Sequence, residues 1–314
     1  MPVYAIDELR ELLSRVAAPY QHSDPVIRYL CALFAELSYY HVPQQEIDRR
    51  HRAQLIPCDA YRILVSRGMA TNLLHYLETL EYSRVFVVVD RGAVAVGIMY
   101  QKLLFIGFRG TRFLYDWKVN ISASASLVRL HPRSQALFCD CLKYGFFHSG
   151  FAEEAFRISI KISDAIQNRC GADIEHVFLS GHSLGGAVAA IADYFLDVAP
   201  STVCVFGAPR YADLAAYQSQ LLNLPLQVRR PGDIVPTVPP KAFGYIDHPC
   251  EVGTDGKDYL DPFPYSWLFG DLVRWAGFFL RRFTPHSMEE YRKALGISAA
   301  VSRYAANLAP YDRL

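Results

Sequence analysis

Residues 177–195 read VFLSGHSLGGAVAAIADYF, and this stretch decides the fold class. An apolar run typical of a strand passes directly into an apolar run typical of a helix, and Ser183 lies at the junction. Glycines at 181, 185 and 186 surround the serine, at an entropy cost that a plain core segment would not carry. A hydroxyl at such a junction also needs a partner once it leaves water. The arrangement therefore indicates a functional site.

The segment GHSLG at 181–185 fits the pattern G-x-S-x-G, in which a sharp strand-to-helix turn presents a serine hydroxyl at the edge of a sheet. The N-terminus of the following helix places backbone N–H groups and a positive dipole beside any oxyanion formed there. A phosphate-binding loop is the main alternative, but that loop needs a lysine where this chain has Ala187. We therefore predict that Ser183 is a nucleophile at an elbow of this kind.

The patterns around the elbow predict an α/β fold. Three β-rich runs at 84–90, 93–100 and 102–108 are typical of a strand meander. After residue 150, helical and strand patterns alternate, which favours a largely parallel sheet with helices on both faces. Residues 1–80 have helical patterns, including an N-cap at Asp24 followed by Pro25. We predict a single domain over 1–314, with an N-terminal helical addition at 1–80 and a catalytic core at 81–314.

Composition excludes several classes of protein. The net charge of the 314 residues is +1 and basic residues occur at most in short pairs, so a nucleic-acid partner is not expected. The seven cysteines form no C-x-x-C pair, which indicates reduced thiols and no metal site. The N-terminus lacks the pattern of a Sec-type export signal, and no apolar run reaches bilayer length. Localisation is unknown from the sequence, with the cytoplasm as the default and export by a signal-less route still open.

A serine nucleophile needs a base and a carboxylate that orients the base, and in this type of fold they follow the serine in the order acid, then histidine. Asp233 follows the predicted strand LQVRR and lies in a turn rich in glycine and proline. Asp197 and Asp213 are poorer candidates, because the patterns place them within helices. Two histidines follow Asp233, and His286, just before a predicted helix, is preferred as the base over His248.

An oxyanion also needs two donors. The backbone N–H of Leu184 is the first, and Thr111, which follows the apolar strand FIGF and Arg109-Gly110, is the predicted second. Loss of one such donor typically slows turnover by about 10²–10³-fold.

These segments together resemble the class 3 lipases, the α/β-hydrolases that include the fungal triacylglycerol lipases. The segments that match, in order, are GFRGT, FHSGF, LSGHSLGGA, FGAPR, RRPGDIVPTVPP and HSMEEY. The resemblance implies hydrolysis of carboxylic esters without metal or cofactor, with Ser183, Asp233 and His286 as the triad and Thr111 and Leu184 as the oxyanion hole. It also implies a lid after the oxyanion residue, where Trp117 lies at a suitable place although the rest of this stretch diverges.

The substrate is predicted from an aromatic segment, YSWLFGDLVRWAGFFLRRF, at 265–283. Drawn as a helix it is apolar on most sides, so it is either buried or in contact with lipid. Trp267, Trp275 and Phe279 are the predicted substrate-binding residues, with Trp117. The predicted function is a lipase acting on acylglycerol-type esters, with possible contact with a membrane or lipid interface. A phospholipase, a small-ester carboxylesterase and a catalytically silent lipase-like binding module remain the alternatives.

Overall fold

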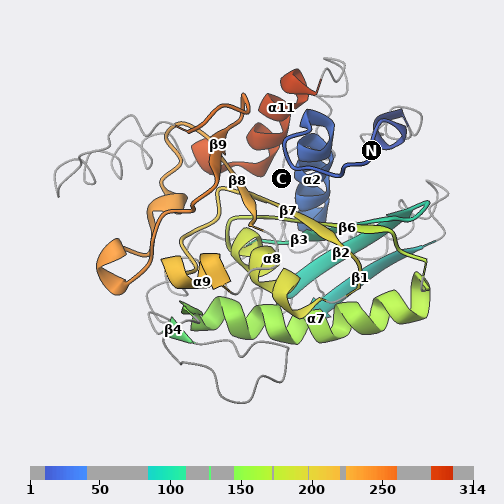
Figure 1. Ribbon diagram of the computed structural model, residues 1–314, viewed down its shortest axis with the longest axis horizontal. Helices are drawn as coiled ribbons and strands as arrows, with labels where there is room; N and C mark the ends of the chain where they lie inside the picture. The colour runs from blue at the N-terminus through green and yellow to red at the C-terminus, as the bar shows by residue number, and fades with distance from the viewer. Residues whose placement is uncertain are drawn as a thin grey trace, which may run out of the picture.

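In the described part of the chain, one seven-stranded sheet forms the centre of the computed structural model (Figure 1). The strand order is β1-β2-β3-β6-β7-β8-β9. The pairs β1–β2 and β2–β3 are antiparallel, whereas the four later pairs are parallel. The predicted α/β fold with a mostly parallel sheet is confirmed. The structure describes residues 11–40, 84–110, 127–128, 145–171, 173–196, 198–219, 224–259 and 284–299.

The strands of the sheet follow the apolar runs of the sequence. The predicted meander is confirmed, and its two hairpin turns include Arg91 and Gln101, both with positive φ. A short β4–β5 pair lies outside the sheet. The bounds are β1 Val85–Asp90, β2 Ala93–Tyr100, β3 Leu103–Phe108, β4 Leu127–Val128, β5 Phe147–His148, β6 His176–His182, β7 Ser201–Phe206, β8 Leu226–Arg229 and β9 Glu251–Gly253.

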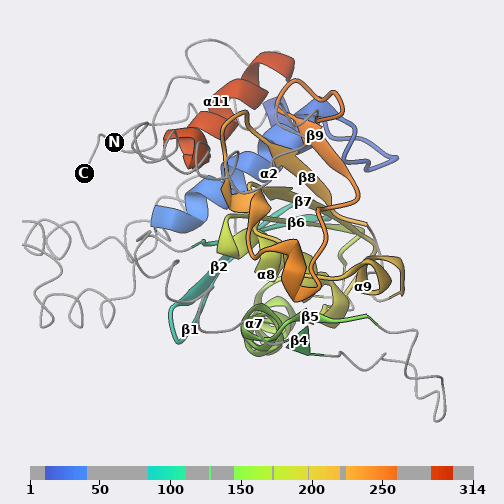
Figure 2. The same ribbon diagram turned by 90° about the vertical axis from the view of Figure 1, so that its left-hand side faces the viewer.

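Helices cover both faces of this sheet. Successive side chains of a strand point to opposite faces, so Phe105 joins a core with α2 and α11, while Ile106 joins a core with α7 and α8. Figure 2 shows the same two layers, with α2 and α11 above the sheet and α7 and α8 below it. The helices are α2 Pro25–Leu37, α7 Ser149–Arg169, α8 Leu184–Phe195, α9 Leu214–Ser219 and α11 Met288–Ser298, with 3₁₀ turns η1 Ser38–Tyr40, η2 Val235–Thr237, η3 Lys241–Phe243 and η4 Thr284–His286.

Helix α2 begins as the sequence predicts. The Asp24 carboxylate accepts a hydrogen bond from the Val26 N–H at 2.7 Å, and Pro25 occupies the first turn, where no N–H is needed. From Val26 to Leu37 every residue is buried, because the helix lies between the sheet and α11. The segment predicted as an N-terminal addition therefore contributes one wall of the same core. Residues 1–10 and 41–80 of this predicted addition lie outside the described residues.

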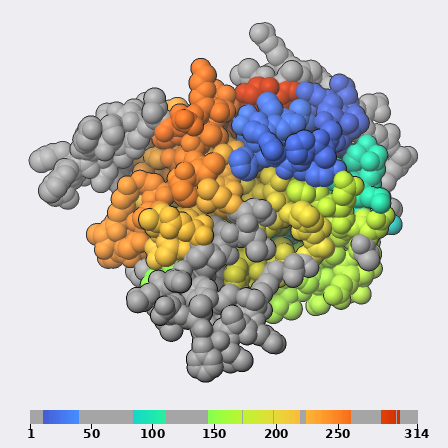
Figure 3. All heavy atoms as spheres, in the orientation of Figure 1, coloured from blue at the N-terminus to red at the C-terminus, as the bar shows by residue number. Residues whose placement is uncertain are grey.

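Helices α2 and α11 are also joined by a buried ion pair. Arg292 Nε donates to Glu36 Oε2, and the two side chains are 0% and 5% exposed. In the space-filling view, the N-terminal segment (blue) lies directly beside α11 (red) on the face toward the viewer (Figure 3). The N-terminal helix and the last described helix are thus packed as a unit on the sheet.

Two further predictions concern thiols and membranes. The cysteines within the described ranges, Cys31, Cys170, Cys204 and Cys250, are free. Among the same residues, no helix is both long enough and apolar enough to cross a bilayer.

Candidate active site

The turn between β6 and α8 holds Ser183 in an unusual backbone conformation. Its φ of 58° and ψ of −132° lie where residues with a side chain are rarely found, and such strain costs about 1–3 kcal/mol. Ser183 occupies the N-cap position of α8, yet among the described residues its hydroxyl makes no hydrogen bond that caps the helix. The side chain is 4% exposed. The predicted sharp strand-to-helix turn at Ser183 is confirmed, its backbone is strained, and the serine hydroxyl does not cap the helix.

Two glycines make this turn possible. A Cβ on Gly181 would lie 2.2 Å from the carbonyl oxygen of Gly185, and a Cβ on Gly185 would lie 2.5 Å from the carbonyl oxygen of Phe108. Both separations are far below a normal carbon–oxygen contact. The start of α8 therefore packs against the ends of β6 and β3 at a distance that only glycine allows.

Asp233 lies at the C-terminal side of β8, where the sequence predicts the acid. Its Oδ1 accepts a hydrogen bond from the Val235 N–H at 2.9 Å, and its Oδ2 accepts one from His286 Nδ1 at 2.8 Å. Asp233 and His286 are 1% and 7% exposed. The structure thus brings the predicted acid and the predicted base into contact across 53 residues of sequence.

Tyr291 is a third member of this hydrogen-bond group, and the sequence analysis did not single it out. Its hydroxyl donates to Asp233 Oδ2 at 2.6 Å and accepts a hydrogen bond from the Arg230 N–H at 3.1 Å. Burial, and then the charge of Asp233, raises the pKa of Tyr291 well above its usual range, so the phenol stays protonated as a donor. The one sequence signal was its place five residues after His286, at the start of the predicted helix.

Gly207, just after β7, was also missed. Its φ is 54°, and a Cβ there would lie 2.5 Å from Asp233 Oδ2, 2.9 Å from Tyr291 Oη and 3.2 Å from His286 Nδ1. The three polar atoms meet directly over this residue. The segment FGAPR at 206–210 therefore places a glycine where any side chain would displace the acid from the histidine.

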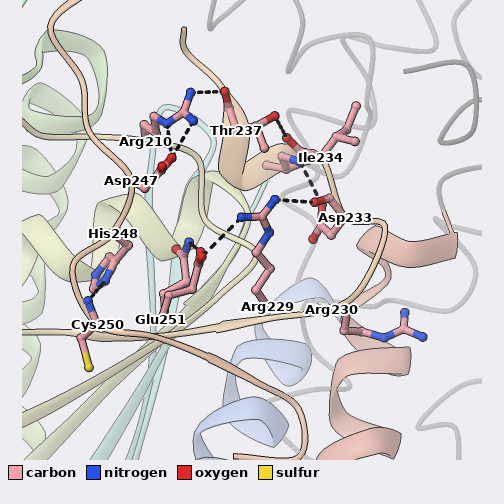
Figure 4. Close-up of polar contacts among 12 residues, drawn as sticks. Arg210, Arg229, Arg230, Asp233, Ile234, Thr237, Asp247, His248, Cys250 and Glu251 are labelled. Carbon is pink, nitrogen blue, oxygen red and sulfur yellow. Dashed lines mark hydrogen bonds and ion pairs between the residues drawn. The ribbon is translucent and has the colours of Figure 1, made fainter. Parts of the chain in front are cut away.

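The loop that carries Asp233 is braced by arginines (Figure 4). Arg229 bridges two groups. Its Nη1 lies 3.3 Å from Glu251 Oε2, and its Nη2 donates to the carbonyl oxygen of Asp233 at 3.5 Å. Arg210 donates to Asp247 and to the carbonyl oxygens of Thr237 and Pro239. Figure 4 shows both guanidinium groups directed into the loop. Charge-assisted hydrogen bonds of this kind hold the turn in one conformation.

The other candidate residues have structural places. His248, the alternative base, is buried; its Nε2 lies 3.1 Å from Tyr211 Oη, and its Nδ1 accepts the Cys250 N–H at 3.2 Å. The interpretation of Asp213 as a residue within a helix was wrong. It precedes α9, and its Oδ1 accepts the Ala216 N–H at 2.8 Å, so it caps the helix instead of extending it. Asp197 lies outside the described residues.

Leu184 is the first residue of α8, so its backbone N–H belongs to the free first turn of the helix. The predicted second oxyanion donor, Thr111, lies outside the described residues, although Gly110 before it is described. The predicted substrate-binding residues Trp117, Trp267, Trp275 and Phe279 lie outside them as well. Within the described ranges, no cluster of three or more His, Cys, Asp or Glu side chains is arranged to hold a metal ion.

Arg109, the residue between the end of β3 and Gly110, is a buried charged group. Arg109 is 6% exposed, and its Nη2 donates to the carbonyl oxygen of Gly92 at 2.7 Å. Burial raises the pKa of Glu154, on α7, to about 7, against the smaller opposing effects of Arg157 and Arg109. The charge of Asp90 acts in the same direction as burial. Glu154 therefore ionises near neutral pH, whereas an unfolded glutamate ionises near 4.5.

Glu154→Gln is expected to change how stability depends on pH. Because the folded carboxyl has the higher pKa, ionisation between pH 5 and 8 opposes folding in the wild type, and glutamine removes this loss. At pH 8 the variant should be more stable by about 1–2 kcal/mol, with allowance for partial exposure, and at pH 5 the difference should be small. Urea unfolding at both pH values measures it. Glu153→Gln, which alters an exposed neighbour, is the control, and equal behaviour of the two variants would contradict this assignment.

A strained serine between a central strand and a helix, with an Asp–His pair after later strands, is the arrangement of the α/β-hydrolases. Within that class, residues 105–243 match the family described as Lipase (class 3). The matched region contains β3, the elbow and the loop of Asp233.

The chain is similar to several fungal lipases. The chain is 29% identical over 168 residues to secreted mono- and diacylglycerol lipase 1 of Fusarium solani. The matched region covers 51% of this chain and 47% of the Fusarium protein. It thus spans about half the length of this curated relative. Among solved structures, Rhizomucor miehei triacylglyceride lipase is 19% identical with a TM-score of 0.44, covering 73% of this chain and 78% of that one. Lipase II from Rhizopus niveus is 20% identical with a TM-score of 0.45, covering 68% and 82%.

Proposed function

We propose that the chain is a serine hydrolase of carboxylic esters, with Ser183 as nucleophile, His286 as base and Asp233 as the group that orients the base. The observation that carries the proposal is the 2.8 Å hydrogen bond between His286 Nδ1 and Asp233 Oδ2. It lies beside the end of β7, next to the strand whose end carries Ser183. An aspartate bound at Nδ1 leaves Nε2 of the same ring available to accept a proton from a serine.

The reaction follows from these roles. The Ser183 oxygen attacks the carbonyl carbon of the ester while its proton passes to His286 Nε2, and the imidazolium that forms is stabilised by the Asp233 carboxylate. The negative charge on the carbonyl oxygen is held by the Leu184 N–H at the positive end of α8 and, in this proposal, by Thr111. The alcohol leaves with the proton from His286. Water, deprotonated by the same ring, then attacks the acyl-serine. The bond to the Ser183 oxygen breaks, His286 returns the proton to that oxygen, and the carboxylic acid is released.

The proposed substrates are acylglycerol-type esters. The family match and the Fusarium solani relative, a mono- and diacylglycerol lipase by name, support a lipid ester over a soluble one. The aromatic segment predicted at 265–283 is the proposed source of acyl-chain contacts, through Trp267, Trp275 and Phe279. Contact with a lipid interface through this segment is part of the same proposal.

Hydrolysis of p-nitrophenyl esters from acetate to palmitate tests the function. We expect turnover to be fastest at eight carbons or longer, because an apolar acyl site gains binding energy with each buried methylene. A fluorophosphonate should block turnover and add its mass to the peptide that contains Ser183. A preference for acetate or butyrate would replace the lipase by a small-ester carboxylesterase. Absence of both turnover and labelling would contradict the hydrolase and favour a lipase-like binding module.

A further inference from the structure

Tyr39 lies beside the elbow, although it comes from the opposite end of the sequence. It belongs to η1, which directly follows α2, and its side chain is half-buried. Its hydroxyl oxygen lies 2.7 Å from His182 Nδ1, across 143 residues of sequence. His182 is the residue immediately before Ser183, so the contact joins the N-terminal segment to the turn that holds the proposed nucleophile.

The same hydroxyl also touches the end of β3. A Cβ on Gly110 would lie 2.2 Å from Tyr39 Oη, 2.3 Å from the carbonyl oxygen of His182 and 3.2 Å from Ser183 Cβ. Burial raises the pKa of Tyr39 well above its usual range, while the charge of Arg109 and a hydrogen bond from the Gly110 backbone oppose this rise. The phenol is therefore neutral. It lies between the end of β3, which precedes Thr111, and the end of β6, which precedes Ser183.

The ring of His182 in turn supports the ring of His286. Their centroids are 4.4 Å apart, with an angle of 35° between the ring planes. Burial lowers the pKa of His182 well below its usual range, and the charge of His286 acts in the same direction. A contact with the His286 backbone opposes this lowering of the His182 pKa. Among the described residues, His182 Nε2 has no partner with full hydrogen-bond geometry, and the 2.7 Å contact of Nδ1 with Tyr39 is the closest polar contact of this ring.

We propose that Tyr39 is a positioning residue of the hydrolytic site, whose phenol joins the end of β3 to the end of β6 and fixes the His182 ring against which His286 rests. The proposal rests on the proposed function of Ser183 and His286. It also gives the N-terminal segment a role in the chemistry in addition to covering the sheet.

The hydrogen-bond roles follow from the number of protons available. Tyr39 accepts from the Gly110 backbone, and its one O–H has two acceptors within reach, His182 Nδ1 at 2.7 Å and the His182 carbonyl oxygen at 3.5 Å. The shorter contact is the better hydrogen bond. In this proposal Tyr39 therefore donates to His182 Nδ1, with the single proton of the neutral His182 on Nε2. A neutral His182 is needed because a second positive ring at this distance would oppose the imidazolium that His286 becomes in the reaction. Without the phenol, His182 Nδ1 is a free acceptor in a buried place, and both ring orientation and tautomer are released.

Tyr39→Phe tests the proposal, with Tyr20→Phe as the matched control. Tyr20 lies in the same N-terminal segment and also makes one phenolic hydrogen bond, to Glu175 at 2.8 Å, just before β6 begins. The two contacts lie at opposite ends of the seven-residue strand β6, about 20 Å apart. We expect Tyr39→Phe to lower kcat for a p-nitrophenyl ester about 10-fold with KM within about twofold, because a misplaced catalytic group affects the transition state most. Tyr20→Phe should leave both unchanged.

A purely structural role for Tyr39 would change stability but not this split between kcat and KM. An active wild type with an unchanged kcat in Tyr39→Phe would overturn the proposal and leave the hydrolase intact. A wild type that neither turns over nor reacts with a fluorophosphonate would instead overturn the proposed function.

Histidine ring ¹⁵N NMR provides a readout independent of turnover. The His182 signals, assigned by their loss in His182→Gln, should show the proton on Nε2 in the wild type and a mixture of tautomers in Tyr39→Phe. If the phenylalanine variant does not fold, the wild-type spectrum alone decides, because a proton on Nδ1 excludes donation by Tyr39.

Discussion

Substitution of Ser183 by alanine is expected to lower kcat for ester hydrolysis by roughly 10⁶-fold while the protein remains folded. The nucleophile and its base act as a unit, so removal of the serine hydroxyl leaves only the oxyanion donors and substrate binding to accelerate the attack of water. Because the described structure assigns no cap hydrogen bond to this hydroxyl, its loss should cost the fold little. The p-nitrophenyl ester series measures kcat, and urea unfolding measures the stability of the same preparation.

Ser183→Gly separates the chemistry from the strain. Both variants lack the nucleophile, but only glycine accepts a φ of 58° and a ψ of −132° without strain. We expect the glycine variant to be more stable than the alanine variant by about 1 kcal/mol, although glycine costs more backbone entropy. Residual activity near the wild-type value in either variant would show that another residue attacks the ester. Equal stability of the two would show that the turn holds no strain at this position.

Arg292→Met is expected to lower the free energy of unfolding by about 3–5 kcal/mol. The substitution removes the cation that faces the Glu36 carboxylate in a place where both side chains are almost fully buried. A carboxylate left in this environment must either stay charged at a high desolvation cost or take up a proton. Urea unfolding of the variant, compared with the double variant Glu36→Leu and Arg292→Met, measures the effect. The double variant should recover most of the loss, since it removes both charges of this pair.

Lys293→Met is the control on the neighbouring position of the same helix. Lys293 pairs with Glu289 and Glu290 at the surface, where ion pairs contribute about 0–1 kcal/mol. A loss in Lys293→Met as large as that in Arg292→Met would assign the effect to helix α11 as a whole. A small loss in both would mean that the buried pair does not hold α11 against α2.

Much of the fold and the central residues of the site were predictable because their signals are local. Strand β6, the glycines and helix α8 are adjacent in sequence, and the turn between them follows from the residues that form it. Asp233 and His286 required one more rule, the order of acid and base along strands of a parallel sheet, and their 2.8 Å contact agrees with that order. The error at Asp213 has a similar origin, because a helical pattern does not distinguish the first residue of a helix from the cap before it.

The sequence by itself determined the alternating strands and helices, the elbow at Ser183 and the choice of Asp233 and His286, since each depends on a pattern within one segment or on chain order. Only the tertiary structure decided which residues support them. Tyr39 reaches His182 across 143 residues, and Glu36 reaches Arg292 across 256. Tyr291 and Gly207 come from separate elements to the same carboxylate. These contacts leave no periodic trace, because a hydrogen bond or close approach between distant segments depends on how the layers pack and not on the residues beside it in the chain.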